Sequence, residues 1–304
     1  MAVIQKKIDM IGEARATGRG NKLWLECLKF IGVLVVAGLT MELLGTFLGG
    51  LILGVLGVTS PFANTLVSLY GEIIGIGMVI GYCVLLEKRT VRSMGFRGRD
   101  FALQYLKGLG IGFGMMAVTV LLGWALGGFR YKGLSDSIRP GILLAFFIGY
   151  MIQGMCEEVM CRGYLMISVA RKNSIPAAVI TNAVVFMLLH GLNPGFGPLP
   201  ILNLFLFGVF ASLYMLKTGN IWGVGAIHSI WNFAQGNFFG LSVSGTALTP
   251  TVFVFGNAGH TLINGGVFGP EGGIPVTLVY GVGIAVLLLL AKKEESAQQN
   301  EVLS

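Results

Sequence analysis

Eight apolar stretches follow one another along the chain, and each is long enough to approach or cross a lipid bilayer. A membrane helix needs about 20 mostly apolar residues. Hydrophobic residues make up 54% of the sequence and charged ones 12%, against about 25% charged residues in a soluble domain. We therefore predict an all-α, polytopic membrane bundle of about eight transmembrane helices. The stretches cover about 30–53, 63–86, 106–126, 142–170, 175–190, 201–216, 221–239 and 275–291.

The order of these stretches predicts three parts in the chain. Residues 1–29 form a basic cytoplasmic segment without the apolar region of a signal peptide. Residues 30–291 form a single transmembrane domain, and residues 292–304 form a polar, disordered, cytoplasmic tail. The loop at 240–274 is rich in turn formers and is expected to fold over the outer mouth of the bundle. The 47 glycines are interpreted as helix-packing residues.

The basic residues lie in short runs between the apolar stretches. The net charge of +7 in this pattern favours contact with lipid headgroups over binding of nucleic acid. With the N-terminus in the cytoplasm, all but three of the 21 Lys and Arg residues fall on the inner side, and the exceptions are Arg130, Lys132 and Arg139. The positive-inside rule therefore predicts a cell-membrane protein with both termini cytoplasmic.

Two adjacent glutamates interrupt the fourth apolar stretch. Ionisable groups inside a membrane are costly, and they mark functional sites unless they are paired. Glu158 and Arg162 are four residues apart, which is the favourable order for an ion pair on one helix face. Glu157 lies about 100° around the helix and has no such partner, so it suits the role of a general base. For Glu158, a purely structural role as the partner of Arg162 is as good an interpretation as a functional one.

Further polar groups occur at a similar depth in two other stretches. His190 ends the fifth stretch, and the seventh carries His228 and Asn232 four residues apart. A face with an imidazole and an amide can bind a metal, donate to an oxyanion or relay protons. A lone membrane histidine commonly forms only an interhelical hydrogen bond. Together with Glu157, however, three spans bring polar groups to one layer, which indicates a functional site.

These residues form three motifs in a familiar order. The sequence resembles the CAAX protease and bacteriocin-processing family of intramembrane peptidases, most firmly over about 141–239. Ser93–Phe96 and the FGPEGG stretch at 268–273 are also similar to segments of some members. The motifs are Glu157-Glu158-Val-Met-Cys-Arg162-Gly163, Phe186-Met-Leu-Leu-His190 and His228-Ser-Ile-Trp-Asn232.

The resemblance implies hydrolysis of a peptide bond in a membrane-associated or lipidated peptide, of the CAAX or bacteriocin type. It implies that Glu157 activates water, that Glu158 and Arg162 support the site, and that His190, His228 and Asn232 complete it. Glu157, His190 and His228 are acceptable zinc ligands, although the H-E-x-x-H signature is absent. We favour a metal-free route, with His228 and Asn232 stabilising the oxyanion, and a cavity that opens toward the cytoplasm or laterally to lipid.

Two other functions stay open at this level. An ion-coupled transporter would use buried glutamates as proton sites and predicts two related halves with broken helices, for which the sequence shows no repeat. A non-catalytic immunity or scaffold protein predicts that variants of Glu157 and His228 keep full biological activity. Glu42 and Glu72, in the first two stretches, are predicted to be structural or gating residues. The four cysteines are predicted to be packing residues.

Overall fold

The computed structural model describes residues 10–18, 20–57, 62–136, 138–246 and 250–303, and it confirms the all-α membrane bundle. Each of the eight predicted stretches is helical, and four of them contain a π-helical segment. The first stretch forms α2 (Leu23–Thr40), a π-helix (Met41–Gly45) and α3 (Thr46–Leu56), and the second forms α4 (Ala63–Gly81) with a π-helix (Tyr82–Leu86). The third forms α5 (Phe101–Ala125), and the fourth forms α6 (Pro140–Glu158), a π-helix (Val159–Met166) and α7 (Ile167–Ala170). The last four stretches form, in order, α8 (Ile175–Leu189), α9 (Pro198–Thr218), α10 (Trp222–Phe233) with a π-helix (Ala234–Phe238), and α12 (Ile274–Leu303).

Two of the eight segments are shorter than a full membrane span. Six helices of the described residues are long and apolar enough to cross a membrane. α8 has 15 residues, which gives a length of about 22 Å against a hydrocarbon core of about 30 Å. α8 is therefore too short to cross the hydrocarbon core by itself. The segment Trp222–Phe238 is also short, and it is buried in the centre of the bundle.

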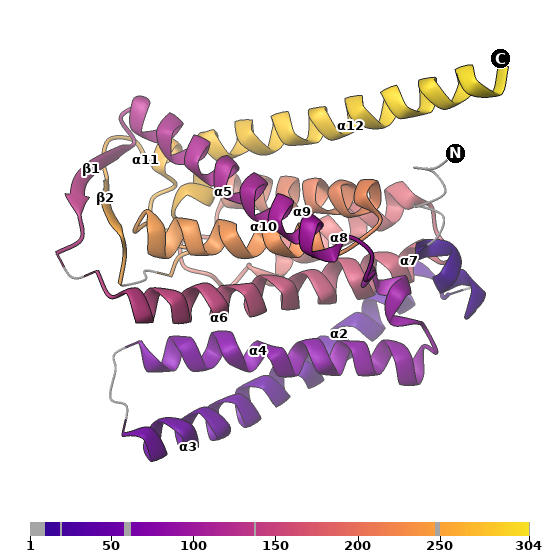
Figure 1. Cartoon of the computed structure of the whole chain (residues 1–304), viewed down its shortest axis with the longest axis horizontal. Helices are drawn as coiled ribbons and strands as arrows, with labels where there is room; N and C mark the ends of the chain where they lie inside the picture. The colour runs from indigo at the N-terminus through magenta and orange to yellow at the C-terminus, as the bar shows by residue number, and fades with distance from the viewer. Residues whose placement is uncertain (1–9, 19, 58–61, 137, 247–249, 304) are drawn as a thin grey trace.

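The two ends of the bundle differ in what they carry (Figure 1). The chain termini lie at one end, which we call the terminal end. The opposite end, called the sheet end, carries β1 (Phe129–Leu134) and β2 (Phe253–Asn257), which pair antiparallel with a bulge between Tyr131 and Gly133. β2 belongs to the 240–274 loop, where a strand was not predicted. Short helices at Thr261–Asn264 (α11) and Pro270–Gly272 complete this loop.

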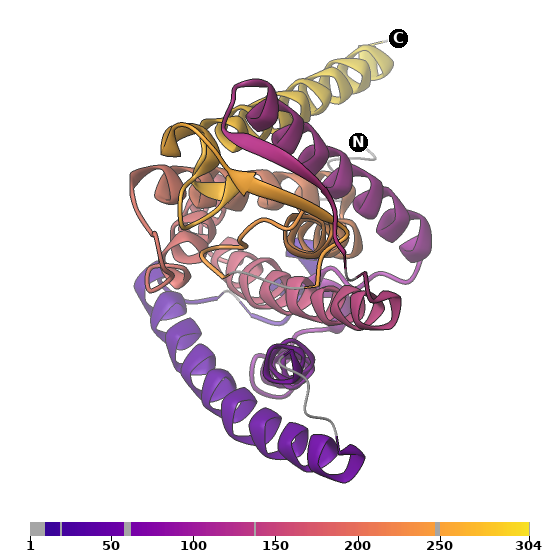
Figure 2. The same ribbon diagram turned by 90° about the vertical axis from the view of Figure 1, so that its left-hand side faces the viewer.

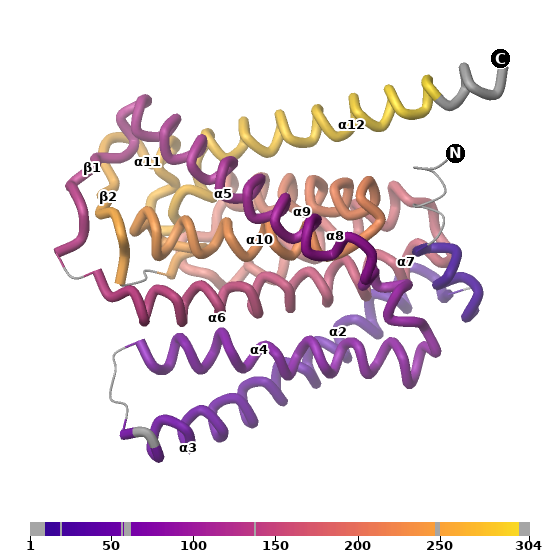
Figure 3. The backbone as a smooth tube through the Cα atoms, in the orientation of Figure 1, coloured from indigo at the N-terminus to yellow at the C-terminus, as the bar shows by residue number. Residues whose placement is uncertain are grey.

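The first span lies at the edge of the bundle. Figure 2 shows α2 and α3 set apart from the remaining helices, with α4 next to them, and α4 and α6 run side by side (Figure 3). In the most apolar 18-residue window of each helix, 11% of the residues are buried in the first span, whereas 61% are buried in α9. The core therefore forms around α6, α8, α9 and α10, the helices that carry the predicted site or pack directly on it.

Glycines bring some of these helices into close contact, as predicted. A Cβ at Gly108 of α5 would lie 2.3 Å from the Gly223 carbonyl oxygen, and one at Gly112 would lie 2.5 Å from the Ile227 carbonyl oxygen. Any larger side chain at either position would push α5 away from α10.

The C-terminal tail differs from its prediction. Residues 292–304 were expected to be disordered, but α12 continues to Leu303. Ala, Gln, Glu and Lys are good helix formers, and extending an existing helix requires no new nucleation. An ion pair between Lys217 and Glu294 also ties this extension to α9. At the other terminus, Lys6, Lys7 and Arg19, which were predicted as cytoplasmic, lie outside the described residues.

A buried ionic cluster joins three segments at the terminal end. Glu87, which follows the second span, pairs with Lys29 of α2 and lies 3.3 Å from Arg171 after α7. Arg89 donates to the Gly163 carbonyl at 2.8 Å and to Ser168 Oγ at 2.9 Å. Burial would raise the pKa of Glu87, but the hydrogen bond from Lys29 and the charge of Arg89 outweigh it and hold that pKa below its usual range. The cluster thus fixes α2 and α4 against the helix that bears both glutamates.

Candidate active site

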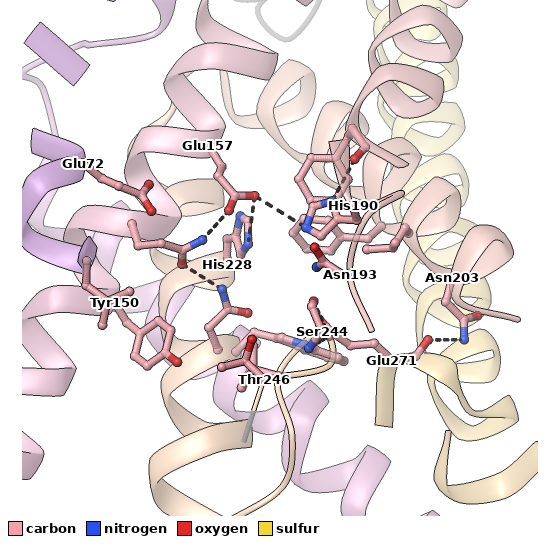
Figure 4. A pocket seen from close by; sticks show the side chains of 18 of the residues that line it. Glu72, Tyr150, Glu157, His190, Asn193, Asn203, His228, Ser244, Thr246 and Glu271 are labelled. Carbon is pink, nitrogen blue, oxygen red and sulfur yellow. Dashed lines mark hydrogen bonds and ion pairs between the residues drawn. The ribbon is translucent and has the colours of Figure 1, made fainter. Parts of the chain in front are cut away.

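Glu157 reaches into a cavity from the last turn of α6 (Figure 4). The cavity has a volume of about 230 Å³ and is lined by Glu157, His190, His228 and Asn232, among others. The Glu157 side chain is 26% exposed, whereas that of its neighbour Glu158 is fully buried. Two consecutive carboxylates therefore occupy different environments, one open to the cavity and one enclosed in the protein.

A π-helix follows the two glutamates directly and is buried at every residue. Such segments occur frequently at functional sites. Within it, Arg162 Nη1 donates to Glu158 Oε1 at 2.9 Å, which confirms the predicted ion pair. The guanidinium of Arg162 also lies over the ring of Phe186, 4.5 Å from the ring centroid. The charge of Glu158 is thus balanced inside the core.

His228 of α10 is oriented by the buried glutamate. Its Nδ1 lies 2.8 Å from Glu158 Oε1. The Glu158 carboxylate can only accept a hydrogen bond, so Nδ1 of His228 carries the proton and donates it. The other ring nitrogen, Nε2, points away from Glu158. Nε2 lies 3.8 Å from Glu157 Oε2, on the cavity side.

His190 approaches the same oxygen from the end of α8. Its Nδ1 donates to the Phe186 carbonyl at 2.9 Å, and its Nε2 lies 4.0 Å from Glu157 Oε2. The described ion pairs of Glu157 involve only these two histidines, His190 and His228. Separations of 3.8–4.0 Å are too long for direct hydrogen bonds, but one water molecule placed between the atoms reaches both. Side chains from three of the predicted membrane stretches therefore come together at Glu157, as expected from their similar depths.

Asn232 connects to Glu157 through Gln153, which was not predicted as a site residue. Asn232 Nδ2 donates to Gln153 Oε1 at 2.9 Å, and Gln153 Nε2 donates to Glu157 Oε1. Gln153 lies one helical turn before Glu157. Its polar side chain in an apolar helix, four residues from a candidate catalytic carboxylate, is a signal that could have identified it.

The loop of the sheet end supplies the rim of the cavity. Glu271 accepts hydrogen bonds from the backbone nitrogen of Ser244 at 2.8 Å and from its hydroxyl at 2.7 Å. Asn203 of α9 donates to the Glu271 carbonyl at 2.7 Å. Ser244, Thr246 and Glu271 all line the cavity, which agrees with the expected position of this loop over the mouth of the bundle. These contacts depend on the path of the loop and could not be predicted from residue spacing.

A second cavity adjoins the first. It has a volume of about 510 Å³, lies between the first span and α4, and is lined by Glu42, Thr46, Asn64, Ser68 and Glu72. Glu72 also lines the cavity of Glu157. Cys83, Cys156 and Cys161 are buried, Cys27 is partly buried, and none of the four forms a disulfide, which agrees with the predicted packing role.

The three predicted metal ligands, Glu157, His190 and His228, come together at the cavity. Among the described residues, no group of three His, Cys, Asp or Glu side chains is arranged to hold a metal ion. The separations of 4.0 and 3.8 Å from Glu157 Oε2 to Nε2 of His190 and of His228 leave room for a shared water molecule.

The fold and the site define a class: a multi-pass membrane protein with a carboxylate, two histidines and two amides around one cavity. Within this chain, residues 139–234 match the family model described as type II CAAX prenyl endopeptidase Rce1-like. This match covers all the predicted site residues and confirms the resemblance that the three motifs indicated. Searches of the curated proteins and of the solved structures gave no match.

Proposed function

We propose that the protein is an intramembrane endopeptidase in which Glu157 activates a water molecule. The observation that carries this proposal is the position of Glu157 Oε2 within 4.0 Å of Nε2 of both His190 and His228. The match to a family of CAAX-type membrane proteases supports the same reaction class. The substrate is a membrane-associated or lipidated peptide or protein.

The hydrogen-bond pattern supports different roles for the two histidines. His190 Nδ1 donates to a neutral carbonyl, so Nε2 of the neutral ring is an acceptor. A water molecule beside Glu157 then donates one hydrogen to Glu157 Oε2 and the other to His190 Nε2. His228 Nδ1 instead donates to a carboxylate, which stabilises the imidazolium, and in that form Nε2 is a donor.

Hydrolysis then proceeds in two steps. Glu157 takes a proton from the water while the water oxygen bonds to the carbonyl carbon of the peptide. The resulting oxyanion receives hydrogen bonds from His228 Nε2 and from the Asn232 N–H that does not bond to Gln153. Glu157 then gives its proton to the peptide nitrogen and the C–N bond breaks, which releases a carboxylic acid and an amine. The acid passes its proton to the amine, so the final products are a carboxylate and an ammonium group.

The experiment compares membrane proteomes of cells that express the wild-type protein or the Glu157→Gln variant. Glu295→Gln, which alters an exposed carboxylate on α12, is the matched control. We expect at least one membrane peptide to stay uncut with Glu157→Gln and to be cut with the wild type and the control. Identical peptide sets in all three strains would contradict the proposal.

A further inference from the structure

The cavity beside Glu157 is built from the part of the protein nearest the sheet end. α4 contributes Thr65, which is in its first turn, and α9 contributes Asn203, which is in its second. The loop contributes Ser244 and Thr246. The labelled residues of the rim and of the site lie around one open space in Figure 4. The cavity therefore extends from Glu157 toward the sheet end.

The route from the terminal end is closed by packed side chains. Every residue from Glu158 to Arg171 is buried, including both members of the Glu158–Arg162 pair. Phe186 and Phe207 are 1% and 4% exposed and enclose the guanidinium of Arg162. A peptide could reach Glu157 from that side only by unpacking the core, which is as dense as an organic crystal.

The charges of the two ends assign them to the two sides of the membrane. At the sheet end the basic residues described are Arg130, Lys132 and Arg139, whereas the basic runs at 88–99, 171–172 and 292–293 lie at the terminal end. Short loops rich in Lys and Arg remain in the cytoplasm. The sheet end, with the cavity, therefore faces away from the cytoplasm, which differs from the cytoplasmic opening expected from the sequence.

We propose that the site receives its peptide from the non-cytoplasmic side of the membrane. The substrate class is then an exported or membrane-anchored peptide whose cleaved bond lies in the outer half of the bilayer or just beyond it. A prenylated C-terminus exposed in the cytoplasm would meet the closed end of the bundle. This inference rests on the proposed peptidase function for the substrate, but the direction of the cavity is independent of catalysis.

Cysteine labelling tests the direction of the cavity. Thr246→Cys places a thiol at the exposed rim, and Ser296→Cys places one on an exposed position of α12 at the other end. The wild-type protein, with its partly buried Cys27, gives the background. In intact spheroplasts, a membrane-impermeant maleimide is expected to label Thr246→Cys and to leave Ser296→Cys at background until the membrane is opened. The reverse pattern would overturn the inference.

Mapping of the cleaved bonds tests the substrate class. Peptides that stay uncut with Glu157→Gln are expected to carry their cleavage sites on the non-cytoplasmic side, and cytoplasmic sites would overturn the inference. The two proposals fail in different ways. If no peptide changes with Glu157→Gln, the peptidase function is wrong, whereas the direction of the cavity is decided by the labelling alone.

Discussion

Glu158 Oε1 accepts a hydrogen bond from His228 Nδ1 at 2.8 Å, although the two residues are 70 positions apart in the chain. The same oxygen accepts from Arg162. One buried carboxylate therefore neutralises a cation within its own helix and orients a histidine on another. The neighbouring Glu157 is left facing the cavity, where it contacts both histidines and Gln153 but no described Lys or Arg.

Removing the charge of Glu158 should destabilise the protein as well as slow cleavage. In Glu158→Gln the buried Arg162 loses its counter-ion, and breaking one side of such a pair costs about 3–5 kcal/mol. The melting temperature of the purified protein in detergent should fall clearly below that of the wild type. Glu157→Gln is the matched comparison, and it should melt near the wild type because its side chain faces the cavity. Equal stability of Glu158→Gln and wild type would contradict this role.

Gln153 should be a positioning residue for Glu157. The Gln153→Leu variant has a side chain of similar size but lacks the hydrogen bonds to both Glu157 and Asn232. We expect the cleavage rate to fall about 10²-fold, the effect of a small misplacement of a reacting group, with little change in melting temperature. Gln153→Asn should stay equally slow because its shorter amide does not reach both partners. A wild-type rate for Gln153→Leu would show that the amide is dispensable.

Gly154 sets the distance between the two helices that carry Glu157 and His228. A Cβ at Gly154 would lie 2.7 Å from the Ser229 backbone nitrogen, whereas one at Gly141 of the same helix meets no atom within 4 Å. Gly154→Ala should therefore push α6 from α10, lower the melting temperature and reduce cleavage. Gly141→Ala should leave both unchanged. If the two variants behave alike, the close contact of α6 and α10 is not needed for the site.

The ionic cluster at the terminal end should make stability depend on pH. The pKa of Glu87 is held below its usual range, so this carboxylate contributes stability above its unfolded pKa, about 4.3, and loses it as the pH falls through the folded value. The melting temperature of the wild type should therefore drop more as the pH falls below about 4.3 than that of Glu87→Gln. Parallel curves for the two proteins would exclude this contribution.

The sequence predicted the contacts that depend on spacing within one helix or on the depth of a residue in the membrane. The Glu158–Arg162 pair follows from a separation of four residues, and the meeting of Glu157 with both histidines follows from similar depths in three spans. The contact of Glu158 with His228 was not predicted. It depends on the rotation of α6 against α10, which is fixed by packing at Gly154.

Features that depend on loops and on helix ends were the least predictable. The hydrogen bonds of Glu271 to Ser244 need the folded path of the 240–274 loop, and the pairing of β1 with β2 joins segments more than a hundred residues apart. The extension of α12 to Leu303 was missed because polar composition was taken as disorder, although its residues favour a helix that has already begun.

The central claim is that Glu157 activates the water that hydrolyses the peptide bond. The most direct test reconstitutes the purified wild type, Glu157→Gln and Glu295→Gln into liposomes with the peptide identified by the proteome comparison, and follows incorporation of ¹⁸O from labelled water into the new C-terminus. We expect Glu295→Gln to match the wild type, and Glu157→Gln to be slower by at least about 10²–10⁴-fold with an unchanged melting temperature. Incorporation of ¹⁸O at the wild-type rate by Glu157→Gln would contradict the account.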